Sequence, residues 1–473
     1  MKKKILVILV FVATFLSFVY PYRDKDWGWH FRYGEYLFKT GHLLKTDIYS
    51  WTMTGFPWTN HEWLFDPVIY TIFKFSGYIG ASLAGAIVTF FCFWLLVKKF
   101  ELSYWKLAIA GFFFSQLLDV GIREGLRGQV LGFIPLAILM YILIRSWEKI
   151  KLLWFIPPLM LLWVNLHGSF AFGLLIIAIF FACRLFQKPK DWKILFGTGI
   201  LSILATLFNP YVLGVYYDVI IHASSPYLKN IFEWLPITYN CDYCHVPSFG
   251  LYSILLAVAF IEAPNAQNLP FLITALILIF PSYEYRRNMP VYLIATFPLL
   301  LGYLQNLKFD LDKYKITQFA FLVGLIVVIE FNLFNRLPGF HFYNYSEADY
   351  CNFASQCPVQ LTNFLVQNPP KGKGFNFYDW GGYLIGKGVQ ARLFIDGRMH
   401  LWQTSDGYSP FADLVAIYYD GDINKFNNYN FDWVLVPPNS AVYKNITDKK
   451  VQGDWIIRYK DEWSAYFVNA KVQ

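Results

Sequence analysis

The stretch "YRDKDWGWHFRYGEY", residues 22–36, follows directly on the first apolar run of the chain and combines acids, indoles and an imidazole. Residues 24–30 of it include Asp24, Asp26, Trp27, Trp29 and His30. Ionisable groups are tolerated at a membrane surface, but a cluster of them beside tryptophans indicates a functional site. An aspartate there could take the proton from a hydroxyl, and an indole offers a flat face for a sugar ring. The alternative for the tryptophans is an interfacial aromatic belt.

The composition indicates a polytopic membrane protein. Of the 473 residues, 56% are hydrophobic and only 15% are charged, whereas soluble domains carry roughly a quarter charged residues. The formal charge of +8 is spread over short loops between apolar runs. This distribution reports topology and contacts with anionic membrane lipids, and it argues against nucleic-acid binding.

About eleven apolar runs are predicted to span a membrane, since a span needs about 20 mostly apolar residues. These runs are 5–21, 79–97, 104–118, 128–145, 152–165, 168–186, 194–211, 248–262, 268–282, 289–304 and 316–334. The run at 61–77 also contains charges and a proline. It predicts an amphipathic helix lying in the interface.

The basic residues orient the chain. The start "MKKK" precedes an apolar run with no small-residue cleavage site, which predicts an uncleaved first span with a cytoplasmic N-terminus. The odd number of spans then places the C-terminal segment outside, with a prokaryotic plasma (inner) membrane as the simplest location. The predicted domains are a transmembrane domain, 1–335, with its first external loop at 22–78, and an external domain, 336–473.

The external domain is predicted to be a small α/β domain. The segments "ARLFIDG", "FDWVLVP" and "WIIRYKDEWSAYFVN" alternate as strands do. Residues 358–368 and 410–427 show helical spacing instead. In "FYDWGGYLIGKG", Gly381 and Gly382 predict a turn between two strands.

The order of features in the first external loop resembles that of the GT-C superfamily of membrane glycosyltransferases. Its members include protein O-mannosyltransferases, aminoarabinose transferases and oligosaccharyltransferases. The acidic motif "DKDWGWH" precedes "GEYLFKTGHLLKTDIYSWTMTGFPWTNHEWL" and an interfacial helix that ends in a glycine. The resemblance implies inverting transfer of a hexose or pentose from a polyprenyl-linked donor to an acceptor on the external face. It puts the catalytic acid at Asp26, with Asp24 as the second candidate.

Other loop residues have more than one reading each. His30 either orients Asp26, contacts the donor phosphate, or is simply a hydrogen-bonded imidazole. Asp47 and Ser50 either cap a turn or belong to the site. Asp24 and Asp26 could also hold Mg²⁺ or Mn²⁺, because hard oxygen ligands suit these ions.

A phosphate leaving group needs positive charge where its negative charge develops. Four arginines fall at external ends of predicted spans, namely Arg123, Arg127, Arg286 and Arg287. Guanidinium forks suit phosphate oxygens, so we predict that these residues bind the donor phosphate. Snorkelling toward lipid headgroups is the alternative for each of them.

Further external residues are candidates for acceptor or sugar binding. They are Trp27, Trp29, His61, Glu62, Asn165, His167, Glu233, Trp234, Asp379, Trp380, Asp396 and Arg398. Those between residues 165 and 234 could equally be polar helix ends, and Asp396 with Arg398 could be a structural ion pair. The segment "YDWG" is similar to the acceptor-peptide motif of oligosaccharyltransferases, but its order differs, so peptide recognition is not carried over.

The cysteines leave several pairings open. "CDYCH", residues 241–245, matches the c-type haem attachment pattern, but no haem-pocket pattern surrounds it, so a local disulfide or idle thiols fit better. Cys351 and Cys357 are predicted to pair with each other or with Cys241 and Cys244.

These features favour an integral-membrane glycosyltransferase. The alternative is a non-enzymatic translocase or binding protein for polyprenyl-linked saccharides. Such a protein would place ionisable groups along a path at mid-membrane depth, whereas the predicted spans contain few charges. The acceptor, whether protein, lipid or glycan, is left open.

Overall fold

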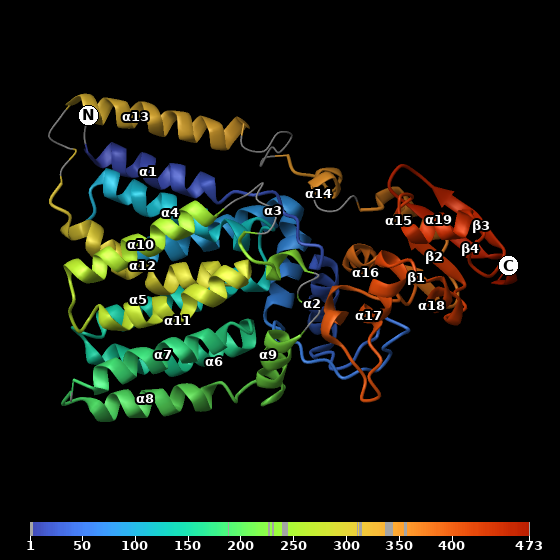
Figure 1. Cartoon of the computed structure of the whole chain (residues 1–473), viewed down its shortest axis with the longest axis horizontal. Helices are drawn as coiled ribbons and strands as arrows, with labels where there is room; N and C mark the ends of the chain where they lie inside the picture. Colours follow the sequence, from blue (N-terminus) through green and yellow to red (C-terminus); the bar gives the residue numbers. More distant parts are fainter. Residues whose placement is uncertain are drawn as a thin grey trace. The chain divides into compact units, whose positions relative to one another are not determined.

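The computed structural model of the chain describes residues 3–187, 189–225, 228, 231–238, 245–309, 311, 315–335, 344–353 and 357–472 (Figure 1). Two compact units are present. The helical unit comprises Met1–Tyr22, Ile79–Val219 and Leu228–Asn344, and the α/β unit comprises Arg23–Tyr78, Ile220–Tyr227 and Tyr345–Gln473. The first loop therefore packs with the C-terminal segment, whereas the sequence analysis grouped it with the spans.

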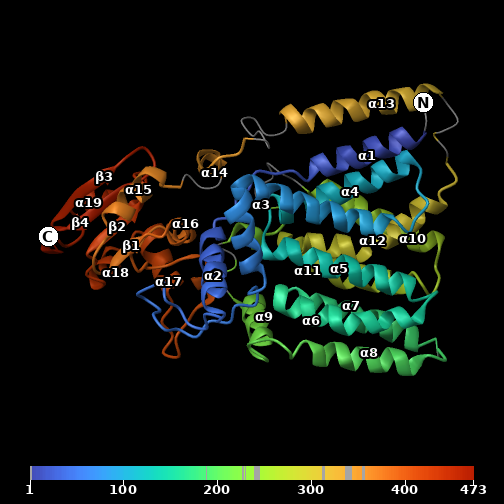
Figure 2. The same ribbon diagram turned by 180° about the vertical axis from the view of Figure 1, so that it is seen from behind.

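The predicted spans are mainly helical, and the long helices of the helical unit lie side by side (Figures 1 and 2). They are α1 (Lys3–Ser17), the second part of α3 (Phe65–Val97), α4 (Tyr104–Ile122), α5 (Gly128–Arg145), α6 (Ile156–Leu166), α7 (Phe170–Leu185), α8 (Trp192–Ala205), α10 (Val246–Glu262), α11 (Leu269–Glu284), α12 (Met289–Asn306) and α13 (Lys315–Glu330). Within the described ranges, four helices are long and apolar enough to cross a membrane: Phe65–Val97, Tyr104–Ile122, Gly128–Arg145 and Ile316–Leu333.

Helix α12 is the central element of the helical unit, because it contacts α4, α5, α10 and α11. Nearly all of its side chains are buried. The ring of Phe297 lies 5.0 Å from that of Phe114, and the Thr296 hydroxyl is 2.9 Å from the hydroxyl of Tyr252. A helix that is apolar on every face is one that its neighbours surround completely.

The predicted interfacial helix and the second span form one element, α3. Its backbone departs from helical geometry at Gly77, which has a φ of 56°. Glycine adopts this left-handed conformation without the steric penalty that a Cβ brings. The break therefore lies at the glycine with which the interfacial helix was expected to end.

The α/β unit contains a four-stranded sheet in the order β1-β2-β4-β3. The strands are β1 (Gly374–Asn376), β2 (Trp433–Val436), β3 (Trp455–Lys460) and β4 (Ala465–Asn469). Strand β1 is parallel to β2, and β4 is antiparallel to both β2 and β3. The strands predicted in "FDWVLVP" and "WIIRYKDEWSAYFVN" are confirmed.

Short helices accompany the sheet. They are α2 (Trp27–Thr40), α14 (Glu347–Phe353), α15 (Val359–Gln367), α16 (Gly381–Lys387), α17 (Pro410–Leu414), α18 (Ile423–Asn428) and α19 (Ala441–Thr447), while α9 (Gly214–Ser224) runs from the helical unit into this one. Helix α15 confirms the prediction at 358–368. The segment 410–427 is helical in pieces, with a π-helical turn at Val415–Tyr419 between α17 and α18.

The strand predicted in "ARLFIDG", 391–397, is wrong. Only an isolated bridge between Leu393 and Ser50 is present. The Asn376 side chain accepts the N–H of Phe394 at 2.8 Å and donates to the carbonyl of Ile395 at 2.8 Å. A side chain thus satisfies backbone groups that a strand ladder would otherwise pair.

The turn predicted at Gly381 and Gly382 is also wrong, since both residues begin α16. Helices α2 and α16 pack closely at their glycines. A Cβ on Gly28 would overlap the Gly382 carbonyl, and one on Gly382 would overlap the carbonyl of Lys25. The glycines therefore serve close approach of two helices, and their backbone remains helical.

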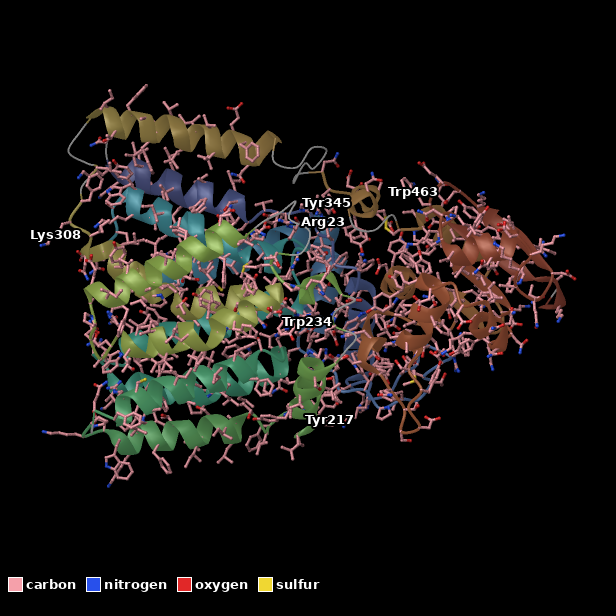
Figure 3. The ribbon with its side chains drawn as sticks, viewed as in Figure 1. Arg23, Tyr217, Trp234, Lys308, Tyr345 and Trp463 are labelled. Atoms are coloured by element: carbon pink, nitrogen blue, oxygen red, sulfur yellow. A yellow bond between two sulfur atoms is a disulfide. The ribbon has the colours of Figure 1, made fainter. Side chains whose placement is uncertain are left out.

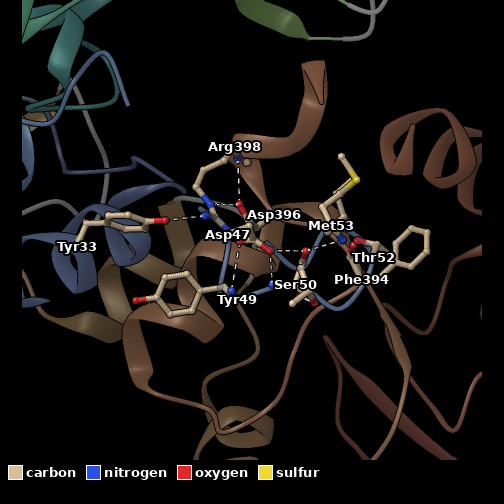
Figure 4. A network of polar contacts seen from close by, with 12 residues as sticks. Tyr33, Asp47, Tyr49, Ser50, Thr52, Met53, Phe394, Asp396 and Arg398 are labelled. Atoms are coloured by element: carbon tan, nitrogen blue, oxygen red, sulfur yellow. Dashed lines mark hydrogen bonds and ion pairs between the residues drawn. The ribbon is translucent and has the colours of Figure 1, made fainter. Parts of the chain in front are cut away.

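A buried charge network joins the first loop to the C-terminal segment (Figure 4). Arg398 donates to Asp396 at 2.6 and 2.8 Å, to Asp47 at 2.7 Å and to the Tyr33 hydroxyl at 3.1 Å. Asp47 in turn accepts the N–H and the hydroxyl of Ser50 at 2.9 and 2.6 Å. Asp47 and Ser50 thus cap a turn, and Asp396 with Arg398 forms the structural ion pair considered above.

We expect Arg398→Met to lower the free energy of unfolding of the α/β unit by about 3–5 kcal/mol, because it leaves two buried carboxylates without their cation. Thermal unfolding of the purified protein measures this change. The control is Lys450→Met, which removes only the exposed ion pair between Lys450 and Asp448 and should leave the Tm unchanged. Equal Tm values for the two variants would contradict the role given to Arg398.

Candidate functional site

Asp26 stands immediately before the first residue of α2 and is half-buried. Its N–H donates to the carboxylate of Asp24 at 3.2 Å, and the Tyr350 hydroxyl donates to the Asp24 carbonyl at 2.9 Å. Asp24 itself is only 2% exposed. The N-terminal end of a helix favours a negative charge. Of the two predicted acids, Asp26 is therefore the more accessible, and Asp24 supports the backbone that carries it.

The Asp26 carboxylate lies against Gly397. A Cβ at Gly397 would overlap Asp26 Oδ1, so no larger residue fits there without moving the acid. The Gly397 carbonyl accepts hydrogen bonds from the Tyr378 hydroxyl at 3.3 Å and from His400 Nδ1 at 3.0 Å. Burial raises the pKa of Tyr378 well above its usual value, and the charge of Asp26 adds to this shift. The C-terminal segment thus supplies one wall of the acid's surroundings.

Three imidazoles form a row in the α/β unit. The rings of His61 and His222 are 5.7 Å apart, and those of His222 and His400 are 5.4 Å apart. Glu62 lies 3.5 Å from His61 Nε2 and 3.6 Å from His30 Nε2. The predicted residues His30, His61 and Glu62 are therefore brought together with two histidines that sequence reasoning missed.

His30 is held deep in the loop. Its Nδ1 is 2.6 Å from Asp66 Oδ1, and the side-chain amide of Asn60 donates to the other oxygen of Asp66 at 2.7 Å. His30 is 3% exposed and Asp66 is 2% exposed. The simple hydrogen-bonded imidazole, one of the three readings of His30, matches these contacts.

The predicted sugar-stacking tryptophans are packed against protein rings. Trp27 stacks on Phe73 with a centroid distance of 4.6 Å. Trp29 lies over His30 and against Trp58, with ring distances of 3.4 and 5.5 Å. Trp380 is 1% exposed. The structure therefore gives these indoles a packing role.

Asp379 differs from these residues because it is partly exposed. Its carboxylate contacts Lys25 Nζ at 2.7 Å, one residue before Asp26. Negative charge on Asp379 is thus balanced locally. This contact places Asp379 beside the acid motif.

In the helical unit, three of the four predicted arginines meet carboxylates. Arg127 and Arg287 share Glu233, the latter at 3.4 Å. Arg123 pairs with Asp119, which also contacts Tyr20 and, at 3.3 Å, His245 Nε2. These contacts join α4, the turn after it and the segment that precedes α12.

The remaining arginine and Trp234 flank this cluster. Arg286 is buried and donates to the Pro236 carbonyl at 2.6 Å, with its guanidinium 4.2 Å from the ring of Phe232. The guanidinium of Arg287 lies 5.2 Å from the ring of Trp234, which Figure 3 labels. Arg286 therefore holds the backbone of this region, while Arg287 reaches the shared carboxylate.

Neither protein-family models nor curated protein sequences give a match to this chain. Solved structures do. The oligosaccharyltransferase AglB from Archaeoglobus fulgidus, in complex with an inhibitory peptide and a dolichol-phosphate, is similar at a TM-score of 0.58 and 11% identity, over 100% of this chain and 75% of that one. ArnT from Cupriavidus metallidurans in the apo state is similar at 0.56 and 12%, over 99% and 98% of the two chains. The same ArnT bound to undecaprenyl phosphate gives 0.53 and 11%, over 98% and 97%.

This chain has the GT-C-type glycosyltransferase fold. The similarity extends over its whole length, which agrees with the apolar helices in making it an integral membrane protein. Identities of 11 to 12% establish the fold, and the chemistry must be argued from the residues themselves.

Two residues that were predicted to bind the acceptor lie at helix ends. The Asn165 amide donates to the carbonyls of Leu161 and Phe208 at 2.8 and 3.0 Å. His167 Nδ1 accepts the N–H of Ser169 at 3.0 Å. Both side chains are buried. These contacts match the alternative in which both residues are ordinary polar ends of helices.

The disulfide of the α/β unit joins Cys351 to Cys357. This confirms the first of the two predicted pairings. Cys241 and Cys244, and with them the haem-like pattern, lie outside the described residues. Within the described residues, no group of three or more His, Cys, Asp or Glu side chains is arranged to hold a metal ion. The Mg²⁺ or Mn²⁺ site at Asp24 and Asp26 stays a prediction.

We expect His30→Ala to lower the free energy of unfolding by roughly 1–3 kcal/mol, because one oxygen of the buried Asp66 loses its hydrogen bond. His42→Ala is the matched control, since His42 is exposed and follows the C-terminal end of the same helix by two residues. Thermal unfolding in one detergent compares the two. If both variants unfold at the wild-type temperature, His30 does not stabilise the loop in this way.

Proposed function

We propose that the protein transfers a sugar from a polyprenyl-phosphate-linked donor to an acceptor hydroxyl, with Asp26 as the general base. The observation that carries this proposal is the placement of the Asp26 carboxylate, half-buried before α2 and directly against Gly397. The fold supports it, because solved structures of this type were obtained with dolichol-phosphate and with undecaprenyl phosphate.

The proposed reaction is a single displacement. Asp26 takes the proton of the acceptor hydroxyl as the acceptor oxygen bonds to the anomeric carbon. The bond between that carbon and the phosphate oxygen breaks, through an oxocarbenium-like state and with inversion. Polyprenyl phosphate leaves with the electron pair of the broken bond. Its developing charge needs cations, and Arg123, Arg127 and Arg287 are the candidates in the helical unit.

The orientation proposed from the basic residues places the N-terminus in the cytoplasm and the α/β unit outside the cell, across a plasma (inner) membrane. Transfer would then occur on the external face. The acceptor is a protein, lipid or glycan that carries a free hydroxyl. The transferred group is a hexose or a pentose.

We expect Asp26→Asn to reduce the release of free polyprenyl phosphate by roughly 10²–10⁴-fold, the usual contribution of a general base. The assay presents the purified protein with a panel of polyprenyl-phosphate sugars. Asp448→Asn is the control, because Asp448 is an exposed acid of the same unit whose carboxylate contacts Lys450 Nζ at 3.0 Å. Near-normal release by Asp26→Asn would remove this residue from the chemistry. If the wild type releases no polyprenyl phosphate but still binds the lipid, the translocase or binding alternative would be favoured.

We further expect Gly397→Ala to reduce release strongly while changing the Tm little. The atom that the new Cβ would overlap is the end of the Asp26 side chain, so the clash is relieved by moving the carboxylate. Gly374→Ala is the counterpart, because its Cβ would overlap the buried indole of Trp433 and not the acid. That variant should lose Tm and keep its activity per folded molecule. The reverse pattern would show that Gly397 does not position Asp26.

A further inference from the structure

A cavity of about 550 Å³ lies in the α/β unit between α2 and the loop that follows α16. Its polar lining includes Arg32, Tyr49, Lys387, Gln390 and Arg392. Three of these side chains are cations, and no carboxylate lines the cavity. Ligand pockets in proteins typically have volumes of roughly 300–1,000 Å³. The cavity is thus large enough for one small ligand, and its lining favours a negative one.

The acids near these cations do not neutralise them fully. Glu35 contacts both Arg32 and Lys39, at 2.7 and 2.8 Å. Glu347 contacts Lys387 at 2.9 Å. Each acid contacts a lining cation from outside the cavity, and neither is itself part of the lining. Arg392 is exposed, and no carboxylate contacts it in the part of the chain that the structure describes. An excess of positive charge therefore remains around the cavity.

The backbone is shaped to admit the Arg32 guanidinium. Gly388 has a φ of +76° and ends α16 in the left-handed conformation. A Cβ there would lie 2.5 Å from Arg32 Nη2. Arg32 uses Nε for the Ile385 carbonyl, at 3.2 Å, and Nη1 for Glu35. Nη2 thus lies beside Gly388, which lines the cavity. Only glycine at position 388 leaves this space free.

Tyr49 adds a neutral donor. Its hydroxyl points away from the Asp47 and Arg398 network in Figure 4, and it makes no hydrogen bond to the described residues. Burial raises the pKa of Tyr49 to about 12, with Arg398 opposing the shift. The phenol therefore keeps its proton at neutral pH and can donate to an anion.

A purely structural explanation covers only part of this arrangement. Lys387 lies in the last turn of α16, where a cation interacts favourably with the helix dipole. That interaction does not involve Arg32, which belongs to α2, or Arg392, which follows the helix by several residues. Three cations from two separate segments of the chain line one cavity, and an anionic ligand accounts for all of them.

We propose that this cavity binds the carboxylate or phosphate of an acidic sugar carried by the acceptor. That this sugar belongs to the acceptor rests on the proposed function. Binding of an acidic sugar to the cavity does not depend on it. Guanidinium forks and a phenol hydroxyl suit either anion. The acceptor class is then an acidic glycan or sugar phosphate, and recognition occurs within the α/β unit.

The test titrates the full-length protein, in detergent and without donor, with glucuronate, glucose 1-phosphate and glucose. Calorimetry and the shift of the Tm both report binding. We expect saturable binding of at least one anionic sugar, weaker binding at high salt, and none of glucose at the same concentration. The anion that binds distinguishes a carboxylate from a phosphate ligand.

Variants locate the site. Arg392→Gln should weaken binding by roughly tenfold or more, as expected for the loss of a charge-assisted hydrogen bond, and Arg32→Gln should do the same. Lys444→Gln removes an exposed cation elsewhere in the unit and should leave the Kd unchanged. Absence of saturable binding, or equal affinity in wild type and Arg392→Gln, would overturn the proposal. Binding retained by a protein that releases no polyprenyl phosphate would uphold the cavity and reject only the proposed transfer.

Discussion

The α/β unit depends on the guanidinium of Arg398, which is enclosed between Asp396 and Asp47, a residue 351 positions away in the sequence. Burial opposes the charged form, yet the neighbouring carboxylates hold the pKa of Arg398 well above its usual value. The guanidinium therefore stays charged at physiological pH. Separating the first loop from the C-terminal segment would leave charges buried without partners, and this keeps the two segments together.

The position of Asp26 follows from this constraint. Asp396 and Arg398 flank Gly397, so the ion pair also fixes the residue against which the acid lies. On the other side, the glycine contact between α2 and α16 brings the start of α2 close to the same segment. An acid held by packing and by charge needs little reorganisation before it acts, which is what a general base requires.

The sequence could predict those features that depend on the local spacing of apolar residues. Apolar runs located the helices, because burial imposes such runs on neighbouring residues. Short alternating segments located β2, β3 and β4, although β2 is buried at all four of its positions. The strand prediction for "ARLFIDG" failed because the side chain of Asn376, from another segment, forms hydrogen bonds with backbone groups of Phe394 and Ile395. The row of His61, His222 and His400 was missed for the same reason, since its members come from three separate segments and no spacing rule connects them.

The two sets of cations in the α/β unit show how burial decides what a charge can do. Arg398 has no exposed surface on its side chain, and it is matched by carboxylates because an unpaired buried guanidinium would be prohibitively unstable. Arg32, Lys387 and Arg392 border a cavity that water can enter, so incomplete neutralisation is tolerated there. An anion that replaces this water gains the interaction that Arg398 already makes internally. The enclosed cation therefore holds the fold together, and the hydrated ones are left for a ligand.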